Sequence, residues 1–384
     1  METTTLADDA TVVQRVLDHI DRRTTDLGDA VWREPVENYR SPARFDAERE
    51  VLRRTPTPFC PSAALPKPGS FLARDAAGTP VLAVRGRDGR VRAFRNACRH
   101  RGTELAAGAG CQQAFVCRYH GWTYGLDGRL RHVPHEHGFP GLDKAARGLV
   151  PMETAEAHGL VFVTQAPPRR PVVAAEALPP LIPPEYRLLG AAERDVPANW
   201  KILVEGFLEG YHIKFTHPET FYPVQYDNLN VVEQFGANTR IVFPYQAVER
   251  QRAVAPAARS SDGKLTYVYH LFPNAMVATF PGRIIAVVLD PVAIDRTRFI
   301  TWALTNRDAA DAGAQTALEG GGDLIDRGGA EDREVACGIQ RSLASGANEF
   351  FEFGRFEAAI GHFHRALGAA LDAERPGPRA EGAI

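Results

Sequence analysis

The chain of 384 residues lacks several features that mark common classes of protein. Its formal net charge is only -2, so no excess of basic residues indicates binding to nucleic acid or to an anionic membrane. No apolar run approaches the length of a membrane-spanning helix, and residues 1–9 contain no basic stretch followed by an apolar one. We therefore expect a cytoplasmic protein that binds neither nucleic acid nor a membrane.

Cysteine is scarce, with five in the whole chain. Two of the five belong to short motifs in which Cys and His lie close together, Cys98-Arg-His100 and Cys117-Arg-Tyr-His120. The remaining three are Cys60, Cys111 and Cys337. An odd number without an obvious pairing predicts free thiols rather than a framework of disulfides.

The spacing of the two Cys/His pairs is typical of a Rieske-type iron-sulfur cluster. Two thiolates suit one iron of a 2Fe-2S centre, and two neutral imidazoles on the other iron leave less negative charge, which raises the reduction potential. Zinc also binds two Cys and two His, but zinc knuckles usually pair Cys with Cys and His with His. We therefore predict that Cys98, His100, Cys117 and His120 hold a 2Fe-2S cluster and that the chain carries electrons.

The residues around these pairs distinguish two kinds of Rieske protein. Those of respiratory chains carry a further Cys in each loop, and these two form a disulfide beside the cluster. Thr103 and Tyr119 stand at those positions here, and Trp122 follows His120-Gly121 where respiratory proteins tend to show Ser. The loops therefore resemble those of the lower-potential Rieske oxygenases.

A second group of residues predicts a mononuclear metal site. Two His with a carboxylate nearby, here Glu209, His212 and His217, suggest the facial triad that holds non-haem Fe(II). Glu209 and His212 are three apart and would share a helix face, but residues five apart on an ideal helix point about 140° away from each other. The helix must therefore distort or end before His217, where Pro218 disfavours helical dihedrals. The simpler alternative is a pair of ordinary structural histidines.

With both motifs present, the chain resembles the catalytic, large (alpha) subunit of the Rieske non-haem iron oxygenases. This family includes aromatic ring-hydroxylating dioxygenases, several monooxygenases and demethylases. The resemblance covers nearly the whole chain and implies that His212 and His217 bind iron. It also implies that Glu209 links the Rieske centre of one subunit to the mononuclear iron of its neighbour.

The family's third iron ligand is a carboxylate far downstream, at the start of a helix. The resemblance implies Asp332 for this role, with Glu331 as the alternative, because apolar residues at helical spacing follow them. A different interpretation of both acids is an acidic first turn that complements the helix dipole.

The resemblance also implies an activity and partners. The protein would use O2 and externally supplied electrons to hydroxylate or oxidatively demethylate a small organic substrate, expected to be aromatic, as in aromatic hydrocarbon catabolism. No Gly-x-Gly-x-x-Gly follows a strand, so NAD(P)H would act only through a separate reductase, with or without a ferredoxin. A homotrimer is implied, and the need for a small beta subunit stays open.

Three alternatives remain. One is a Rieske electron-transfer protein without a working mononuclear iron, another a binding protein that has lost catalysis, and the third a quaternary-amine monooxygenase within the same family. Eight aromatic residues are candidates for an apolar substrate pocket. They are Phe207, Phe215, Phe221, Tyr222, Tyr226, Phe272, Phe280 and Trp302.

The pattern along the chain predicts an α+β fold. We expect a helical lead-in over residues 1–45, a small antiparallel β Rieske domain over 46–165, and a larger catalytic domain over 166–384. Asp88-Gly89 and Asp127-Gly128 each predict a hairpin, and a Pro-rich linker follows Ala166.

In the catalytic domain we expect an antiparallel sheet flanked by helices, in a helix-grip-like arrangement. Its strands are predicted at 240–245, 267–272, 276–280, 283–289 and 298–304. Helices are predicted at about 331–345 and 347–373, and the glycines of 320–329 mark a mobile stretch before Asp332.

Overall fold

The computed structural model describes residues 6–167, 178–307 and 312–374, with only the course of the backbone for 312–323. Residues 168–177 of the predicted Pro-rich linker lie outside this part. The chain divides into two compact units. One contains the residues up to Leu52 and those from Leu189 onwards, and the other contains Arg53–Pro167 and Leu178–Leu188. Helices and antiparallel sheets both contribute, so the predicted α+β class is confirmed.

The smaller unit contains two antiparallel sheets. The seven-stranded sheet has the order β2-β11-β10-β5-β4-β3-β6. Its strands are β2 (Thr57–Pro61), β3 (Ser70–Ala76), β4 (Thr79–Arg85), β5 (Val91–Arg95), β6 (Gly108–Cys111), β10 (Pro151–Ala157) and β11 (Leu160–Thr164). The three-stranded sheet consists of β7 (Ala114–Val116), β8 (Thr123–Gly125) and β9 (Leu130–His132).

Both predicted hairpins are confirmed. β4 pairs with β5 across Asp88-Gly89, and β8 pairs with β9 across Asp127-Gly128. Gly89 and Gly128 have φ of 79° and 77°, a backbone conformation that glycine adopts without steric cost.

The larger unit is built on a second seven-stranded sheet, with the order β12-β18-β17-β16-β15-β14-β13. Its strands are β12 (Arg187–Val196), β13 (Val231–Phe235), β14 (Asn238–Pro244), β15 (Leu265–Leu271), β16 (Ala275–Phe280), β17 (Arg283–Ala293) and β18 (Arg296–Thr305). The five predicted strands correspond to β14–β18, and neighbours from β13 to β18 are antiparallel. The sequence patterns missed β12 and β13.

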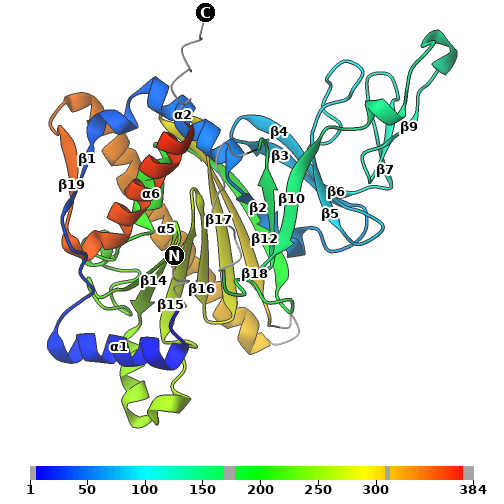
Figure 1. Cartoon of the computed structure of the whole chain (residues 1–384). Coiled ribbons are helices and arrows are strands. Elements are labelled where there is room, and N and C mark those ends of the chain that lie inside the picture. The colour runs from blue at the N-terminus through cyan, green and yellow to red at the C-terminus, as the bar shows by residue number, and fades with distance from the viewer. Residues whose placement is uncertain (1–5, 168–177, 308–311, 375–384) are drawn as a thin grey trace, which may run out of the picture. The chain divides into compact units, whose positions relative to one another are not determined.

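Helices lie beside this sheet (Figure 1). They are α1 (Asp9–Arg22), α2 (Pro42–Arg54), α3 (Trp200–Gly206), α4 (Ile213–Thr216), α5 (Ala312–Ser342) and α6 (Ala358–Glu374). The short helix α3 contacts both β17 and α5, whereas α6 packs on β13 and β14. The buried core between them includes Trp200, Met276 and Phe363. No helix in the described ranges is both long and apolar enough to cross a membrane.

Two helix predictions are wrong in their limits. The helix predicted at 347–373 begins only at Ala358, because Phe350–Phe353 form a strand, β19, that pairs with β1 (Trp32–Pro35). That pairing joins segments more than 300 residues apart, which a local pattern does not reveal. The helix predicted at about 331–345 begins earlier, because α5 runs from Ala312 to Ser342 and includes the glycines of 320–329.

Close packing explains why position 328 is a glycine. A Cβ there would lie 2.4 Å from Cε2 of Phe221, a distance that real Cβ atoms essentially never show. The phenyl ring of Phe221 therefore lies directly against the backbone of α5 at Gly328. Because α5 also carries Asp332, this contact fixes the helix beside the segment that carries the two predicted iron-binding histidines.

Candidate metal centres

The two Cys/His loops share one backbone pattern. In each loop the Cys amide donates to the carbonyl of the fifth residue on, at 2.9 Å for Cys98 and 2.8 Å for Cys117. The Cys carbonyl accepts from the amide of the fourth residue on, at 2.9 Å in both loops. That fourth residue is Gly102 or Gly121, with φ of 82° and 73°, which only glycine adopts readily. The backbone around Cys98 therefore follows the same hydrogen-bond pattern as the backbone around Cys117.

The two sulfur atoms lie inside the unit. Cys98 and Cys117 are each only 3% exposed and both thiols are free. The hydroxyl of Tyr124 accepts a hydrogen bond from the amide of Arg99 at 2.9 Å and lies 3.3 Å from Sγ of Cys98. A thiolate has no hydrogen to donate, so in this contact the hydroxyl would be the donor. A thiolate at Cys98 would thus receive a hydrogen bond.

The two histidines lie nearer to solvent. His100 is half-buried and His120 is exposed, and their ring centroids are 4.7 Å apart. The ring of His100 stacks on Trp122 at 4.9 Å. Burial lowers the pKa of His100, and the charges of His120 and Arg101 lower it further, so the imidazole is neutral and able to bind a metal.

One nitrogen of His100 supports a metal at this place. Its Nδ1 is buried and has no hydrogen-bond partner among the described residues. A buried polar atom without a partner is costly and calls for an explanation such as an absent ion. Two buried thiols with two imidazoles on their outer side fit the donor set of a Rieske cluster.

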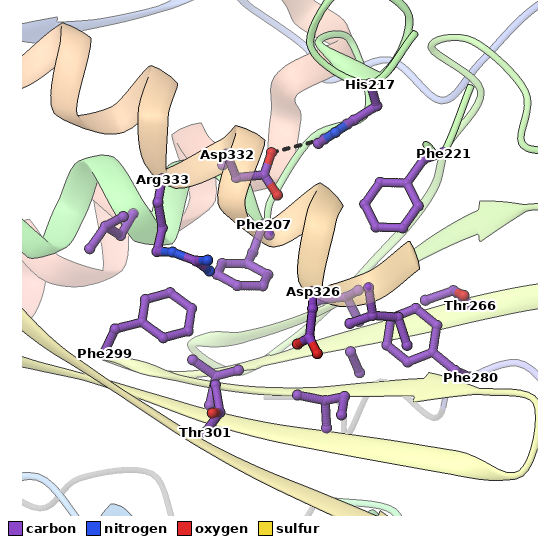
Figure 2. A pocket seen from close by; sticks show the side chains of 18 of the residues that line it. Phe207, His217, Phe221, Thr266, Phe280, Phe299, Thr301, Asp326, Asp332 and Arg333 are labelled. Carbon is purple, nitrogen blue, oxygen red and sulfur yellow. Dashed lines mark ion pairs between the residues drawn. The ribbon is translucent and has the colours of Figure 1, made fainter. Parts of the chain in front are cut away.

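A second candidate metal centre lies in the larger unit. One ligand atom each from His212, His217 and Asp332 lies within 4.8 Å of the other two. Oδ1 of Asp332 is 2.9 Å from Nε2 of His217 and 3.5 Å from Nε2 of His212, and Figure 2 shows the first of these contacts. Among the described residues this is the one group of three or more His, Cys, Asp or Glu that meets this distance limit. The set is the one that defines a facial triad.

The backbone between His212 and His217 explains how two residues five apart can point to one place. α3 begins at the Asn199 cap, whose side chain accepts from the Lys201 amide, and ends at Gly206. The chain then turns, and α4 is a single helical turn with His212 at its N-cap and His217 at its C-cap. The helix thus ends between the two residues, as the spacing requires.

The prediction that Glu209 and His212 share one face of a helix is wrong, because both residues precede α4. The carboxylate of Glu209 instead accepts hydrogen bonds from the backbone that follows it. Its Oε2 accepts from the amides of Tyr211 and His212, the latter at 3.1 Å, and Oε1 contacts Nδ1 of His212. Side-chain capping of this kind competes with helix formation.

Each histidine therefore has an acid on the nitrogen that faces away from Asp332. Glu209 contacts Nδ1 of His212, and Oε2 of Glu331 lies 2.7 Å from Nδ1 of His217. The hydroxyl of Thr220 donates to the same Glu331 oxygen at 2.6 Å. Such partners orient a metal-binding imidazole and raise its basicity.

Glu331 and Asp332 thus occupy different places. Asp332 lies in the three-residue group, while Glu331, the alternative ligand, lies on the outer side of His217. Both are well inside α5, so neither belongs to an acidic first turn. The partnership of Thr220 and Glu331 escaped the sequence analysis, since 111 residues separate them.

The electrostatics of this group favour a cation. Burial lowers the pKa of His212, but the hydrogen bonds to Asp332 and Glu209 outweigh it and raise the pKa to about 10. The same balance raises the pKa of His217. Burial raises the pKa of Asp332, and its contacts with the two imidazoles more than reverse this. Because the two imidazoles hold their protons so strongly, a divalent metal ion could take the place of these protons and supply the positive charge.

A cavity of about 420 Å³ opens beside the three residues. Phenyl rings line much of it (Figure 2), and charged groups also face it. The phenyl rings belong to Phe207, Phe221, Phe280 and Phe299. The charged side chains apart from Asp332 and Glu209 belong to Arg194, Arg283, Asp326 and Arg333.

Three of the eight aromatic candidates line this cavity, namely Phe207, Phe221 and Phe280. Phe215 is 82% exposed instead. Trp302 is buried on β18 between the lining residues Thr301 and Ala303, and alternation along a strand directs it to the other face. Phe299 was missed for the same reason, because only the register of β18 shows which residues face the cavity.

Comparison with known protein families agrees with both centres. Residues 55–145 match the Rieske [2Fe-2S] domain, and residues 184–373 match the ring hydroxylating alpha subunit (catalytic domain). The chain therefore belongs to the family of ring-hydroxylating alpha subunits that carry a Rieske domain.

Individual relatives fall into two groups. Over 213 residues the chain is 30% identical to the carnitine monooxygenase oxygenase subunit of Acinetobacter pittii, covering 52% of this chain and 56% of the relative. It is 27% identical over 292 residues to the large oxygenase component of the naphthalene 1,2-dioxygenase system of Pseudomonas putida, covering 64% of each. The matched region thus spans less than two thirds of each relative.

Among solved structures, a quaternary ammonium Rieske monooxygenase in complex with L-carnitine has a TM-score of 0.73. The match covers 90% of this chain and 96% of that one, at 21% identity. At this identity the likeness shows that the two chains share a fold.

Proposed function

We propose that the chain is the terminal oxygenase component of a Rieske oxygenase system. It would use O2 and electrons from a separate reductase to hydroxylate or oxidatively demethylate a small organic substrate. The observation that carries this proposal is the convergence of His212, His217 and Asp332 at the wall of a largely apolar cavity. Three protein ligands leave coordination positions open, as in non-haem iron oxygenases.

When bound, the 2Fe-2S cluster would supply single electrons and the mononuclear iron would activate O2. Cys98, Cys117, His100 and His120 would hold the cluster. His212, His217 and Asp332 would hold the iron. This division agrees with the burial of the thiols in one unit and with the mutual approach of the three ligand atoms in the other.

The remaining residues of the site would orient the two imidazoles and enclose the substrate. Glu209 and Glu331 fix the orientation of the two imidazoles by contacting Nδ1, which leaves Nε2 for the iron. The phenyl rings of Phe207, Phe221 and Phe299 would exclude water from the reacting substrate. Glu209 is also the residue through which, by family resemblance, an electron would arrive from a neighbouring subunit.

The cavity favours a charged or strongly polar substrate over a bare hydrocarbon. A ligand like naphthalene would strip water from Arg333 and Asp326 without offering them a hydrogen bond. A quaternary amine fits better, because phenyl rings attract a cation through their faces. The aromatic substrate expected from the sequence is therefore the less favoured of the two, although ring hydroxylation stays within the proposal.

The partners belong to the proposal as well. A separate NAD(P)H-dependent reductase is proposed, with or without a ferredoxin, together with assembly as a homotrimer in the cytoplasm. The exposed imidazole of His120 supports the first of these, since an external electron donor could approach it.

Metal analysis and O2 uptake test the proposal together. An oxygenase should contain about three irons per chain, two in the cluster and one alone. With a reductase and either L-carnitine, glycine betaine or an aromatic acid it should consume O2 in proportion to product. About two irons per chain would instead favour the electron-transfer protein, and full metal content without O2 uptake across a broad substrate panel would favour the binding protein.

A further inference from the structure

Arg333 occupies an unusual position in the cavity. It follows Asp332 directly on α5, is half-buried and lines the cavity wall. Its guanidinium lies over the ring of Phe299, 5.7 Å from the centroid, and Figure 2 shows it directed toward Phe207 and Phe299. Within the described ranges, no carboxylate forms an ion pair with it at 4.0 Å or less.

A half-buried guanidinium in such surroundings is costly. Arginine in a protein interior usually pairs with a carboxylate, since an uncompensated charge loses its hydration. Asp326 also lines the cavity, but no carboxylate of the described residues lies within 4.0 Å of the Arg333 guanidinium. The cavity thus contains a cation whose partner is missing from the described part of the chain.

A second guanidinium faces the same cavity from the sheet. Arg194 lies on β12 and lines the cavity, and it also forms no ion pair of 4.0 Å or less with any described residue. Arg194 and Arg333 repel each other. An anion placed near both would relieve this repulsion, whereas a neutral ligand would leave it in place.

The backbone of α5 leaves room for the guanidinium. A Cβ at position 329 would lie 3.2 Å from Nη1 of Arg333, which is tighter than nine in ten real Cβ contacts. Gly329 is itself a cavity residue. The absent side chain therefore lets the guanidinium lie close against the helix and face the cavity.

We propose that Arg333, assisted by Arg194, binds a carboxylate of the substrate, so that the substrates of this oxygenase are small carboxylate-bearing molecules. This inference rests on the proposed function and names the substrate class of the same cavity. A planar guanidinium binds a carboxylate through two parallel hydrogen bonds and fixes its direction. Because Asp332 is the preceding residue on α5, this bidentate contact sets how far the rest of the substrate reaches toward His212, His217 and Asp332.

Matched pairs of ligands test this inference. γ-Butyrobetaine and its primary amide form one pair, and 3-phenylpropanoate and its primary amide form the other. Binding to the iron-loaded protein is measured by calorimetry, which needs no turnover. In at least one pair the carboxylate should bind about 10- to 100-fold more tightly than the amide, as expected for a charge-assisted hydrogen bond in place of a neutral one.

Three variants and one control show whether the preference for the carboxylate depends on Arg333. Arg333→Gln should abolish the preference for the carboxylate and leave amide binding unchanged, and Arg333→Lys should keep part of it. Gly329→Ala, which presses on the guanidinium, should reduce it while the arginine is still present. Arg341→Gln removes a positive charge from the exposed surface of the same helix and should keep the full preference.

Two results would overturn the inference: no carboxylate that binds the parent protein more tightly than its amide, or an Arg333→Gln variant that keeps the full preference. The failure of the proposed function has a different signature, namely the absence of the mononuclear iron or of O2 uptake. Iron content and circular dichroism of each variant show whether it is folded and loaded before ligands are compared.

Discussion

Glu331 and His217 form a contact that joins α5 to the C-terminal end of α4: Oε2 of the acid lies 2.7 Å from Nδ1 of the imidazole. The next residue, Asp332, approaches the other nitrogen of the same ring at 2.9 Å. Two adjacent acids of one helix thus contact opposite sides of one histidine. The arrangement supports the proposal that the inner acid binds the metal and that the outer acid orients the imidazole.

We expect Glu331→Ala to weaken the mononuclear iron site without destroying it. Loss of the orienting acid should lower iron affinity about 10- to 100-fold, whereas Asp332→Ala should abolish iron binding at this site. The visible spectrum of the Rieske cluster should persist in both variants. Glu334→Gln, at an exposed position on α5, is the control, and an unchanged iron affinity in Glu331→Ala would disprove the orienting role.

Glu209→Gln should retain both metal centres and slow turnover by about 10- to 100-fold. The amide still accepts one hydrogen bond, but it lacks the negative charge that faces Nδ1 of His212. Iron analysis and steady-state O2 uptake measure the two effects separately. Normal turnover in this variant would refute a relay through Glu209.

Tyr124→Phe should lower the reduction potential of the cluster. The hydroxyl lies 3.3 Å from Sγ of Cys98, and a hydrogen bond to a cluster ligand stabilises the reduced state, which carries more negative charge. A loss of about 1 kcal/mol corresponds to roughly 40 mV for a one-electron couple. Redox titration followed by electron paramagnetic resonance would measure the shift.

Tyr119→Phe provides the matched comparison. Its hydroxyl accepts from Arg101 at 3.1 Å and lies in a cluster loop, but the hydrogen bond does not involve a sulfur. We expect its potential to stay close to that of the parent. Equal shifts in the two variants would show that the hydroxyl of Tyr124 has no specific effect on Cys98.

The larger unit should lose stability as the pH falls from about 6.5 to about 4. Burial lowers the pKa of His270 to about 4, although the carbonyl of Pro273 acts in the opposite direction. Between the two pKa values the unfolded chain binds a proton that the folded chain does not, so stability increases with pH in this window. The contribution is at most roughly 3 kcal/mol.

His270→Gln removes this group and should flatten that part of the profile. The difference in melting temperature between the parent and the variant is the quantity to follow, from pH 4 to pH 7. Other groups titrate in both proteins and cancel in the difference. A constant difference across the window would mean that His270 does not carry this pH dependence.

Local sequence determined much of the smaller unit. The two Cys/His loops each complete their own hydrogen bonds within six residues, and Asp88-Gly89 closes its hairpin between adjacent strands. Such features depend on short-range backbone geometry, which neighbouring residues dictate. The strands β14–β18 could likewise be predicted from the sequence, because each is a compact apolar run.

The proposed iron site of the larger unit could be predicted only in part from the sequence. His212 and His217 belong to one short segment, and their spacing alone required a break in the helix. The choice between Glu331 and Asp332 depended on the rotation of α5 about its axis, because neighbouring residues on a helix point in directions about 100° apart. Packing of Phe221 against Gly328 is one of the contacts that set this rotation.

The substrate cavity came from tertiary structure alone. Phe299 and Arg194 face it because of the register of β18 and the position of β12, and Arg333 faces it because α5 covers the sheet at that point. The sequence by itself determined which metal-binding groups the chain possesses, since those depend on residue type and short spacing. Only the folded chain decided which side chains meet around the substrate, because that depends on contacts between segments distant in sequence.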